Sequence, residues 1–521
     1  MMHKETPQSG AEPEQARAFL GRCCLLDIET NENGVIYALG AVCGEAQFSL
    51  QPGQRIGAAQ LAGLDDFARD ADFLLGHNIL SHDLPRLRLQ FPGLALLAKP
   101  AIDTLYLSPL AFPENPYHRL VKDYQIVRDS VNDPVEDARL AGRVFVEQWQ
   151  AFGQQLARGS DAPLAYRGLF ARDPGCAGLA AALGAMGAPL LAGDDLIEVL
   201  VWLIQDAVCS EALQRLRDQW SDGQASGVVL AYVAAWLTVA GGNSVLPPWV
   251  RRRFPETAPT LHQLREQPCA NPACRYCREH HDPRHYLRQF FGFDDFRPQP
   301  ATPEGASLQA AIVQAAARNH SLFATLPTGG GKSLCYLLPA LMRYQRRNTL
   351  TIVISPLQAL MKDQVDNFSR QTGTNIAAAL YGLLTLPERG EVQERIRLGD
   401  VGVLYVSPEQ LRNASFVNLI SQREIGAWVF DEAHCLSKWG HDFRPDYLYA
   451  VRFIREFAQK EQSRIPPVQC FTATAKRDVQ GEIVDLIQSD LGLRVNPFAG
   501  GHERNNLHYE VWSAAPHEKQ Q

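Results

Sequence analysis

Short apolar runs recur along this chain, and polar residues follow several of them directly. The runs at residues 23–26, 322–326 and 427–430 have the length and composition of buried strands. Helical spacing appears instead in the amphipathic stretch 196–208. The longest apolar run, 227–240, is shorter than the ~20 residues of a membrane span, so it predicts a buried helix. The pattern predicts an α/β protein with a helical middle.

The run at 322–326 leads through a glycine-rich loop into leucines at helical spacing, which predicts a strand, a phosphate loop and a helix. Glycines let the backbone N–H groups turn inward around phosphate oxygens, where a Cβ would obstruct them. Lys332 would reach the β- and γ-phosphates, and the hydroxyl of Ser333 would hold Mg²⁺. The nucleotide-binding residues of this loop are Thr328, Gly329, Gly330, Gly331, Lys332 and Ser333.

The run at 427–430 ends in Asp431 and Glu432, the first residues of a DEAH sequence. An acid at the end of this strand can bind the metal ion held by the phosphate loop, and the next carboxylate can orient the attacking water. Lys332, Asp431 and Glu432 are therefore the expected catalytic residues of an ATPase.

Residues 290–510 resemble the first motor lobe of a RecQ-family DNA helicase. The similarity rests on SPLQALMKDQV (355–365), YVSPEQL (405–411), FTATA (471–475) and the aromatic-rich SKWGHDFRPDY (437–447). It implies a RecA-like parallel sheet, ATP and Mg²⁺ as cofactors, and 3′-to-5′ unwinding of DNA that is single-stranded or partly duplex. A second RecA-like lobe is expected in sequence beyond these residues, so residues 1–521 alone should turn over ATP slowly.

The adenine motif of that family resembles FGFDDFR (291–297) with Gln309, which implies adenine contacts from Phe293, Arg297 and Gln309. This chain departs from the family pattern by inserting residues 299–308 between the two parts. The insertion makes the contacts of Phe293 and Arg297 less secure than that of Gln309.

The aromatic-rich loop offers Trp439 and Phe443 for stacking on unpaired bases, and His441 and Arg444 for phosphates or the neighbouring ATP site. The alternative is that both aromatic rings are buried beneath the DEAH strand.

The run at 23–26 leads into Asp27 and Glu29, which lie on one face of a strand because side chains alternate. With Asp83 and Asp137 they could form the four acids of a two-metal phosphodiesterase site. Residues 21–150 resemble a DnaQ-like (DEDD) 3′–5′ exonuclease domain with a ribonuclease-H-like fold, which implies Mg²⁺ or Mn²⁺.

The exonuclease resemblance lacks the usual general base. Asn132 stands where the histidine subclass carries its base, and Asp133 stands at the position of the tyrosine subclass. His82 and His118 are candidate substitutes. A domain that cuts DNA and a domain that binds metal or strand ends without cutting both remain open.

Soft ligands gather in CANPACRYCREHH, where Cys269, Cys274 and Cys277 precede two histidines. Their spacing predicts a Zn²⁺ site with His280 or His281 as the fourth ligand. Free thiols are one alternative; the other, an iron–sulfur cluster, would need a fourth cysteine.

The composition is that of a globular protein, and no apolar run predicts a membrane segment. Because 11 cysteines in 521 residues do not indicate a disulfide scaffold, we expect a cytoplasmic protein. The net charge of −7 means that any DNA contact must be local. The candidate patches are Arg251–Arg253 and Arg343 with Arg346 and Arg347, and the alternative for each is a solvated basic face.

The expected organisation is a flexible tail (1–20), an exonuclease-like domain (21–150), a helical connector (151–265), a zinc segment (266–285), a RecA-like lobe (286–500) and the start of a second lobe (501–521). The expected function is ATP-dependent DNA unwinding in repair or recombination, with an appended nuclease-type domain. An ATP-gated DNA-binding platform and an RNA-directed ATPase are the alternatives.

Overall fold

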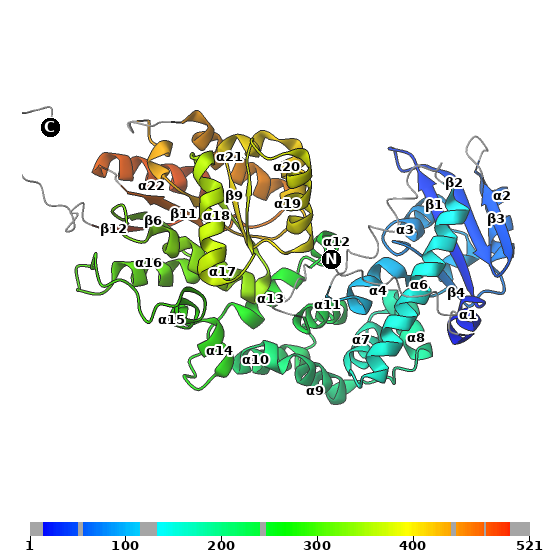
Figure 1. The fold of residues 1–521 in the computed structure, drawn as a ribbon. Coiled ribbons are helices and arrows are strands. Elements are labelled where there is room, and N and C mark those ends of the chain that lie inside the picture. The colour runs from blue at the N-terminus through cyan, green and yellow to red at the C-terminus, as the bar shows by residue number, and fades with distance from the viewer. Residues whose placement is uncertain are drawn as a thin grey trace, which may run out of the picture. The chain divides into compact units, whose positions relative to one another are not determined.

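The computed structural model describes residues 14–50, 56–114, 133–239, 246–438, 444–473 and 476–500. The chain divides into two compact units, Met1–Arg278 and Glu279–Gln521 (Figure 1). Across the described part of the chain, no helix is long and apolar enough to cross a membrane.

The first unit is built on a mixed five-stranded sheet in the order β3-β2-β1-β4-β5. The β1–β2 and β2–β3 pairs are antiparallel, whereas β1–β4 and β4–β5 are parallel. From Cys24 to Glu29 the side chains of β1 alternate between buried and half-buried positions, as predicted for the strand that carries Asp27 and Glu29. The strands are β1 (Cys23–Thr30), β2 (Ile36–Cys43), β3 (Ala46–Leu50), β4 (Phe73–Gly76) and β5 (Ala101–Asp103).

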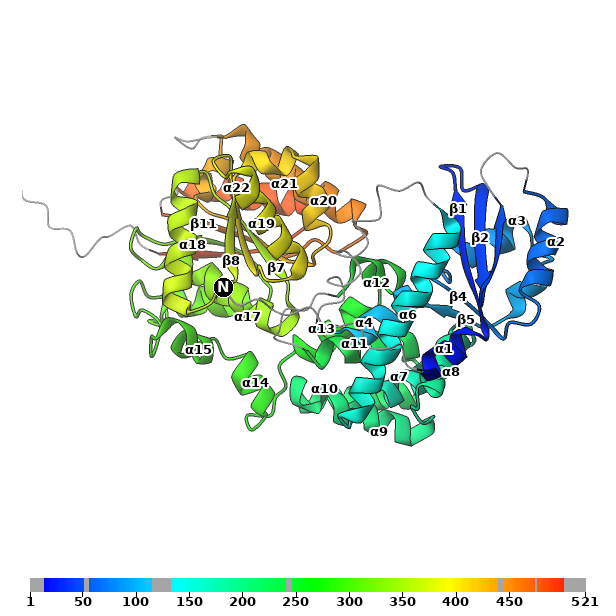
Figure 2. The same cartoon turned by 45° about the vertical axis from the view of Figure 1, so that its right-hand side comes forward.

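Helices form the rest of the first unit (Figure 2). They are α1 (Glu14–Leu20), α2 (Ala58–Phe67), α3 (Asp83–Gln90), α4 (Thr104–Ala111), α6 (Pro134–Ala157), α7 (Ala162–Ala171), α8 (Ala177–Ala185), α9 (Gly193–Ile204), α10 (Ser210–Ser221), α11 (Gly227–Leu237), α12 (Pro248–Arg253) and α13 (Thr257–Arg265). Every residue of α11 except its first is buried, which confirms the helix predicted from its apolar run. Helix α14 (Arg275–His280) spans the boundary between the units.

The structure differs from two of the boundaries expected in the first unit. The tail predicted for residues 1–20 ends in α1, whose Phe19 is buried against Phe73 and Phe145. The connector predicted for 151–265 shares one hydrophobic core with the sheet, since Leu169 and Val229 belong to the same buried cluster as Phe145. Apolar helix faces wide enough to cover a sheet pack onto it instead of forming a separate linker.

The second unit is a seven-stranded sheet in the order β12-β6-β11-β10-β7-β9-β8, and every pairing is parallel. This is the RecA-like arrangement expected for the motor lobe. The strands are β6 (Ser321–Thr325), β7 (Leu350–Ile354), β8 (Ala377–Leu380), β9 (Val403–Val406), β10 (Ile425–Phe430), β11 (Val468–Thr472) and β12 (Val495–Ala499).

Helices cover both faces of this sheet. Phe323 of β6 joins one buried cluster, with α20, α21 and α22, whereas its neighbours Leu322 and Ala324 join another, with α16, α17 and α18. Because the strands are parallel, their carboxyl ends share one edge, where such sheets bind ligands. The helices are α15 (Pro283–Tyr286), α16 (Leu308–Ala317), α17 (Lys332–Arg347), α18 (Gln358–Thr372), α19 (Leu386–Leu398), α20 (Ala414–Ile420), α21 (Pro445–Lys460) and α22 (Arg477–Leu491).

Candidate functional site

The phosphate loop lies between β6 and α17, as its sequence predicts. Gly329 and Gly331 have φ angles of 80° and 82°, in the left-handed region that favours glycine. A Cβ on Gly330 would come within 2.8 Å of the carbonyl oxygen of Pro327. Lys332 and Ser333 open α17, so the backbone N–H groups of its first turn are directed toward the loop, which suits phosphate binding.

The lysine of this loop contacts the DEAH sequence. Nζ of Lys332 lies 2.7 Å from Oε1 of Glu432, and Nδ1 of His434 lies 3.3 Å from Oε2 of the same carboxylate. Burial would raise the pKa of Glu432, but hydrogen bonds from His434 and Lys332 lower it to about 2. Nδ1 of His434 also lies 2.9 Å from Oγ1 of Thr472, at the end of β11. His434 therefore connects Glu432 to the FTATA segment.

Asp431 follows β10 directly, where the sequence predicted a metal-binding carboxylate. Burial raises its pKa, and the charge of Lys332 lowers it. Its backbone carbonyl accepts a hydrogen bond of 2.9 Å from the hydroxyl of Tyr447, which ties the end of β10 to α21. With Ser333 across the loop, a hydroxyl and a carboxylate are available to a divalent ion.

The adenine-motif residues meet beside the phosphate loop despite the insertion at 299–308. The amide of Gln309 accepts a 3.0 Å hydrogen bond from the backbone N–H of Arg297 and donates one of 3.3 Å to the carbonyl of Gly331. The guanidinium of Arg297 donates to the carbonyl of Gly329. Phe293 is 49% exposed and so offers a free aromatic face. The inserted residues form a loop that begins and ends beside Arg297. The Ser307 hydroxyl closes this loop by donating a 2.6 Å hydrogen bond to the carbonyl of Arg297.

Part of the aromatic-rich loop lies outside the described residues, and with it the predicted contacts Trp439, His441 and Phe443. Its two ends are held. The Ser437 hydroxyl and the backbone N–H of Lys438 both donate hydrogen bonds to the carboxylate of Glu482 on α22. At the other end the guanidinium of Arg444 donates to the carbonyl of Pro356, at 3.2 Å, just after β7. The loop therefore starts and ends at the carboxyl edge of the sheet, beside the DEAH sequence.

The basic patch suggested at Arg343, Arg346 and Arg347 is wrong. Arg343 and Arg346 are 2% and 1% exposed, and Arg347 pairs with Glu424. The side chain of Arg343 donates to the carbonyl of Ala316, at 3.1 Å. These cations pack helices against the sheet and are not displayed to a phosphate backbone.

Three of the predicted exonuclease acids converge in the first unit. Oxygens of Asp27, Glu29 and Asp137 lie within 4.8 Å of one another. Asp27 and Glu29 share a face of β1, and Asp137 comes from the first turn of α6. The start of α6 can lie close to β2 because Gly40 of β2 has no side chain. A Cβ at Gly40 would come within 2.3 Å of the backbone of α6.

Asp83 joins the same electrostatic group as the first residue of α3. It is 1% exposed, and its Oδ2 has no hydrogen-bond partner. Burial, followed by the charges of Asp83, Asp137 and Glu29, raises the pKa of Asp27 to about 8. Mutually repelling, partly buried carboxylates of this kind are stabilised by a divalent cation.

His82 is the candidate general base that the structure describes, whereas Asn132 and His118 lie outside the described residues. Its Nδ1 lies 2.8 Å from Oδ1 of Asp83 and its Nε2 lies 3.3 Å from Oγ1 of Thr30. The hydrogen bond to Asp83 raises the pKa of His82. Both ring nitrogens therefore have partners, which suits an orienting role better than that of a base.

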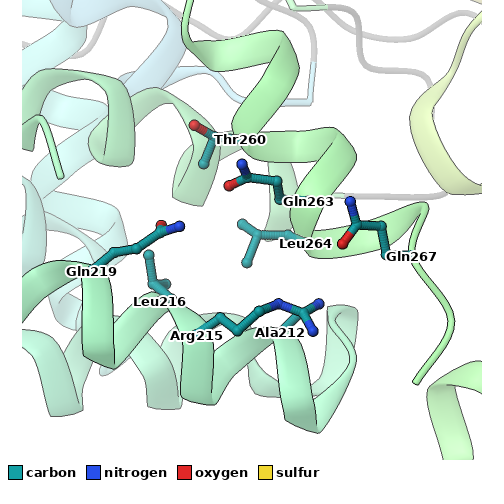
Figure 3. Close-up of a pocket in the computed structure, with 8 residues that line it drawn as sticks. All are labelled: Ala212, Arg215, Leu216, Gln219, Thr260, Gln263, Leu264 and Gln267. Carbon is teal, nitrogen blue, oxygen red and sulfur yellow. The ribbon is translucent and has the colours of Figure 1, made fainter. Parts of the chain in front are cut away.

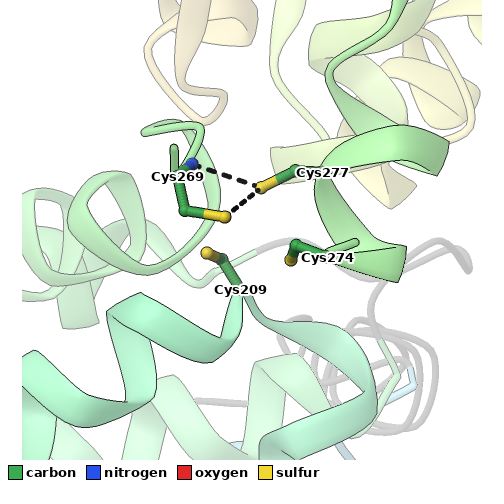
Figure 4. A group of neighbouring side chains, drawn as sticks. All are labelled: Cys209, Cys269, Cys274 and Cys277. Carbon is green, nitrogen blue, oxygen red and sulfur yellow. Dashed lines mark hydrogen bonds between the residues drawn. The ribbon is translucent and has the colours of Figure 1, made fainter. Parts of the chain in front are cut away.

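The cysteine cluster differs from its prediction in one ligand. Cys269, Cys274 and Cys277 do converge, but the fourth member of the group is Cys209 (Figure 4). His280, the predicted fourth ligand, instead has its Nδ1 3.3 Å from the hydroxyl of Tyr286. His281 is likewise engaged, with Nδ1 3.0 Å from the guanidinium of Arg346.

A small pocket lies between α10 and α13 (Figure 3). Its eight lining residues are Ala212, Arg215, Leu216, Gln219, Thr260, Gln263, Leu264 and Gln267. They include amides and one guanidinium but no carboxylate, cysteine or histidine, so the pocket offers neither acid–base nor metal chemistry.

The sequence alone indicated no role for Cys209 or for His434. Cys209 stands alone in an apolar helical region, where no spacing signals a ligand. The bridge of His434 to Thr472 joins two motifs that were noted separately, so their shared edge of the parallel sheet was the available signal.

Comparisons with known proteins agree with the geometry of the second unit. Residues 306–481 match the DEAD/DEAH box helicase family. An ATP-dependent DNA helicase RecQ of Haemophilus influenzae is 36% identical over 226 residues, covering 43% of this chain and 32% of the relative. A probable ATP-dependent DNA helicase RecS of Bacillus subtilis is 36% identical over 208 residues, covering 40% of this chain and 38% of the relative.

This chain thus spans roughly a third of the length of these relatives. Among solved structures, the Pyrococcus furiosus Hef helicase domain aligns with 22% identity and a TM-score of 0.28, covering 37% of each chain. Residues 306–481 of the second unit are therefore similar to DEAD/DEAH box helicases, and the relatives found include RecQ helicases.

Proposed function

We propose that this chain contributes the first motor lobe of a RecQ-type, ATP-dependent 3′–5′ DNA helicase, together with a metal-dependent 3′–5′ exonuclease-type domain. The single observation that supports the motor most strongly is the 2.7 Å pairing of Lys332 with Glu432, which are a hundred positions apart in sequence. It assembles a phosphate-binding cation and a DEAH carboxylate at one sheet edge, which is what nucleotide hydrolysis requires.

Each part of ATP has its own set of residues at this site. Phe293, Arg297 and Gln309 contact adenine, and the loop 328–331 with Lys332 surrounds the phosphates. Ser333 and Asp431 hold Mg²⁺, while Glu432 orients water. His434 contacts both Glu432 and Thr472, so it couples nucleotide binding at Glu432 to the position of the FTATA segment. Turnover also requires an arginine from a second RecA-like lobe, which is the expected partner of this one.

DNA is the proposed substrate, single-stranded or partly duplex, and the work of the complete protein is repair or recombination. The net charge of −7 means that a local surface must provide the contact. The loop 437–447 fits this role, because its ends contact Glu482 and Pro356 beside the DEAH sequence. Trp439 and Phe443 stack on bases, while His441 and Arg444 reach phosphates.

Titrating the full-length protein with a fluorescent ATP analogue and with labelled single strands tests the motor proposal. Wild-type protein should bind both, and Lys332→Ala should lose the nucleotide but keep the DNA. Nucleotide binding that survives in Lys332→Ala would contradict the proposed site.

The exonuclease-type assignment rests on the acid cluster. A mixed sheet with strand order β3-β2-β1-β4-β5 supports a ribonuclease-H-like fold. Asp27, Glu29 and Asp137 converge, and the charge of Asp83 acts on Asp27, which supports the four-acid site that the resemblance implies. These acids would hold Mg²⁺ or Mn²⁺, ions that lower the pKa of a bound water for attack on a phosphodiester.

A second candidate for this domain is recognition of DNA ends without cleavage. It is favoured by His82, whose two ring nitrogens both have partners and which is therefore poorly placed to accept a proton. Incubating a 3′-labelled single strand with Mn²⁺ separates the two functions. Shortening of the strand supports the nuclease, whereas intact DNA that is bound in a Mn²⁺-dependent manner supports recognition. The cofactors proposed for the chain are ATP with Mg²⁺, Mg²⁺ or Mn²⁺ at the acid cluster, and Zn²⁺ at the cysteine cluster.

A further inference from the structure

Four cysteines from separate parts of the first unit point toward one another (Figure 4). Cys209 immediately precedes α10, Cys269 lies between α13 and α14, and Cys274 and Cys277 lie just before and within α14. Their four Sγ atoms all lie within 4.8 Å of one another. We infer that these thiolates bind one tetrahedral Zn²⁺ ion, with Cys209 as the fourth ligand.

The separation of the sulfur atoms fits a single ion. Zn–S bonds of ~2.3 Å place tetrahedral sulfurs ~3.8 Å apart. Sγ of Cys269 and Sγ of Cys277 are 3.5 Å apart, which is too far for a disulfide, whose sulfurs are ~2.05 Å apart. An iron–sulfur cluster places several irons and sulfides between its thiolates and would hold them farther apart than one ion does.

Hydrogen bonds to the sulfur atoms support thiolates at this position. The backbone N–H of Cys269 donates to Sγ of Cys277 at 3.4 Å, and the Ser210 hydroxyl lies 4.0 Å from Sγ of Cys274. Outer-shell donors of this kind orient the sulfurs and stabilise their charge. Asn271 shapes the intervening turn, since its carbonyl accepts from the N–H of Cys274 at 3.1 Å. Cys209 is fully buried, which shields this side of the site from water.

The position of the cluster gives the ion a structural task. The first unit ends at Arg278, directly after Cys277. Of the residues that follow α13, Cys274 and Tyr276 are the buried members of the hydrophobic core. So few apolar side chains hold this segment that a metal cross-link to Cys209 would supply most of its attachment to α10. The ion therefore fastens the end of the first unit to its helical core.

Metal content of residues 1–521, purified with reductant and without chelator, tests the inference. About one zinc per chain is expected, with no visible absorption. Replacing zinc by Co²⁺ should give the intense visible spectrum of tetrahedral sulfur coordination, unchanged in His280→Ala. A coloured iron-containing protein, a chain without stoichiometric metal, or a Co²⁺ spectrum altered by His280→Ala would overturn it.

Matched variants test the contribution of Cys209. Cys209→Ser should lower zinc to below about a tenth per chain, whereas Cys176→Ala, at another buried cysteine of the same unit, should keep it. Trypsin then reports on the segment in wild-type protein, with no substitution. Zinc removal by a thiol-specific mercurial should accelerate cleavage after Arg275 and Arg278 at least about tenfold, and zinc with excess dithiol should reverse this. Equal cleavage with and without zinc would contradict the structural task.

Discussion

The ammonium nitrogen of Lys332 lies 2.7 Å from Oε1 of Glu432, so the cation of the glycine-rich loop and the DEAH carboxylate neutralise each other. Both side chains are largely shielded from water, at 17% and 26% exposed. A nucleotide bound at this loop as proposed would therefore compete with Glu432 for the lysine.

This competition predicts opposite effects on nucleotide binding at the two positions. Glu432→Gln should bind ATP at least as tightly as wild type and lower hydrolysis in the full-length protein by about 10²–10⁴, because a neutral amide cannot orient water as a base. Lys332→Ala should lose binding. Equilibrium titration with a fluorescent ATP analogue and single-turnover hydrolysis measure the two effects. Glu394→Gln, an exposed acid of the same unit paired with Arg397, is the control and should change neither. Weaker nucleotide binding in Glu432→Gln would refute the competition.

For the acid cluster, Asp27→Ala should abolish Mn²⁺- or Mg²⁺-dependent shortening of a labelled strand while leaving ATP binding intact. The control is Glu136→Gln, which changes an exposed acid beside Asp137 that pairs with Arg139. Gel analysis of the products gives the answer. Loss of activity in both variants would show that general charge, and not the cluster, is responsible.

The raised pKa of Asp27, about 8, predicts how the stability of the first unit depends on pH without divalent ions. Between the ordinary pKa of an aspartate and about 8, the folded state retains a proton that the unfolded state has lost, so the free energy of unfolding falls as pH rises through this range. Thermal unfolding in a chelator should therefore occur at a lower temperature at pH 8.5 than at pH 6. Mn²⁺ should reverse most of the difference, and Asp27→Asn should remove it. A melting temperature that is the same at both pH values would contradict the coupling of the four acids.

The sequence predicted where the residues of the two candidate sites, the glycine-rich loop with the DEAH sequence and the acid cluster, would lie, because short, local signals carry each of them. A strand that ends in glycines and lysine, or in paired carboxylates, fixes its own local geometry, and the parallel sheet then brings Lys332 and Asp431 to one edge. The alternation of β1 likewise placed Asp27 and Glu29 together before any fold was known.

Features that depend on distant packing escaped prediction. Cys209 becomes a cluster member only because α10 lies beside the segment after α13, and no residue near it in sequence signals that contact. The three arginines at 343–347 have the composition of a basic patch. However, the side chains of Arg343 and Arg346 lie on the buried side of α17. The connector resembled a separate helical linker because its apolar faces do not reveal which surface they cover.

The loop 437–447 should couple DNA to ATP hydrolysis. In the full-length protein, Trp439→Ala or Arg444→Ala should leave basal hydrolysis nearly unchanged but remove most of its stimulation by single-stranded DNA, since a stacked base contributes ~1–3 kcal/mol. Arg452→Ala, an exposed cation on α21, is the control for charge. Equal losses of basal and stimulated rates would indicate that the loop is structural, with its aromatic rings buried.

The central claim is that the second unit is part of a DNA-directed motor, and steady-state ATP hydrolysis by the full-length protein tests it most directly. The rate is measured with no nucleic acid, with single-stranded DNA and with RNA of the same sequence. We expect the rate to rise at least about tenfold with DNA and to change little with RNA, and we expect no activity in Lys332→Ala. Equal stimulation by RNA, or no response to DNA, would contradict it.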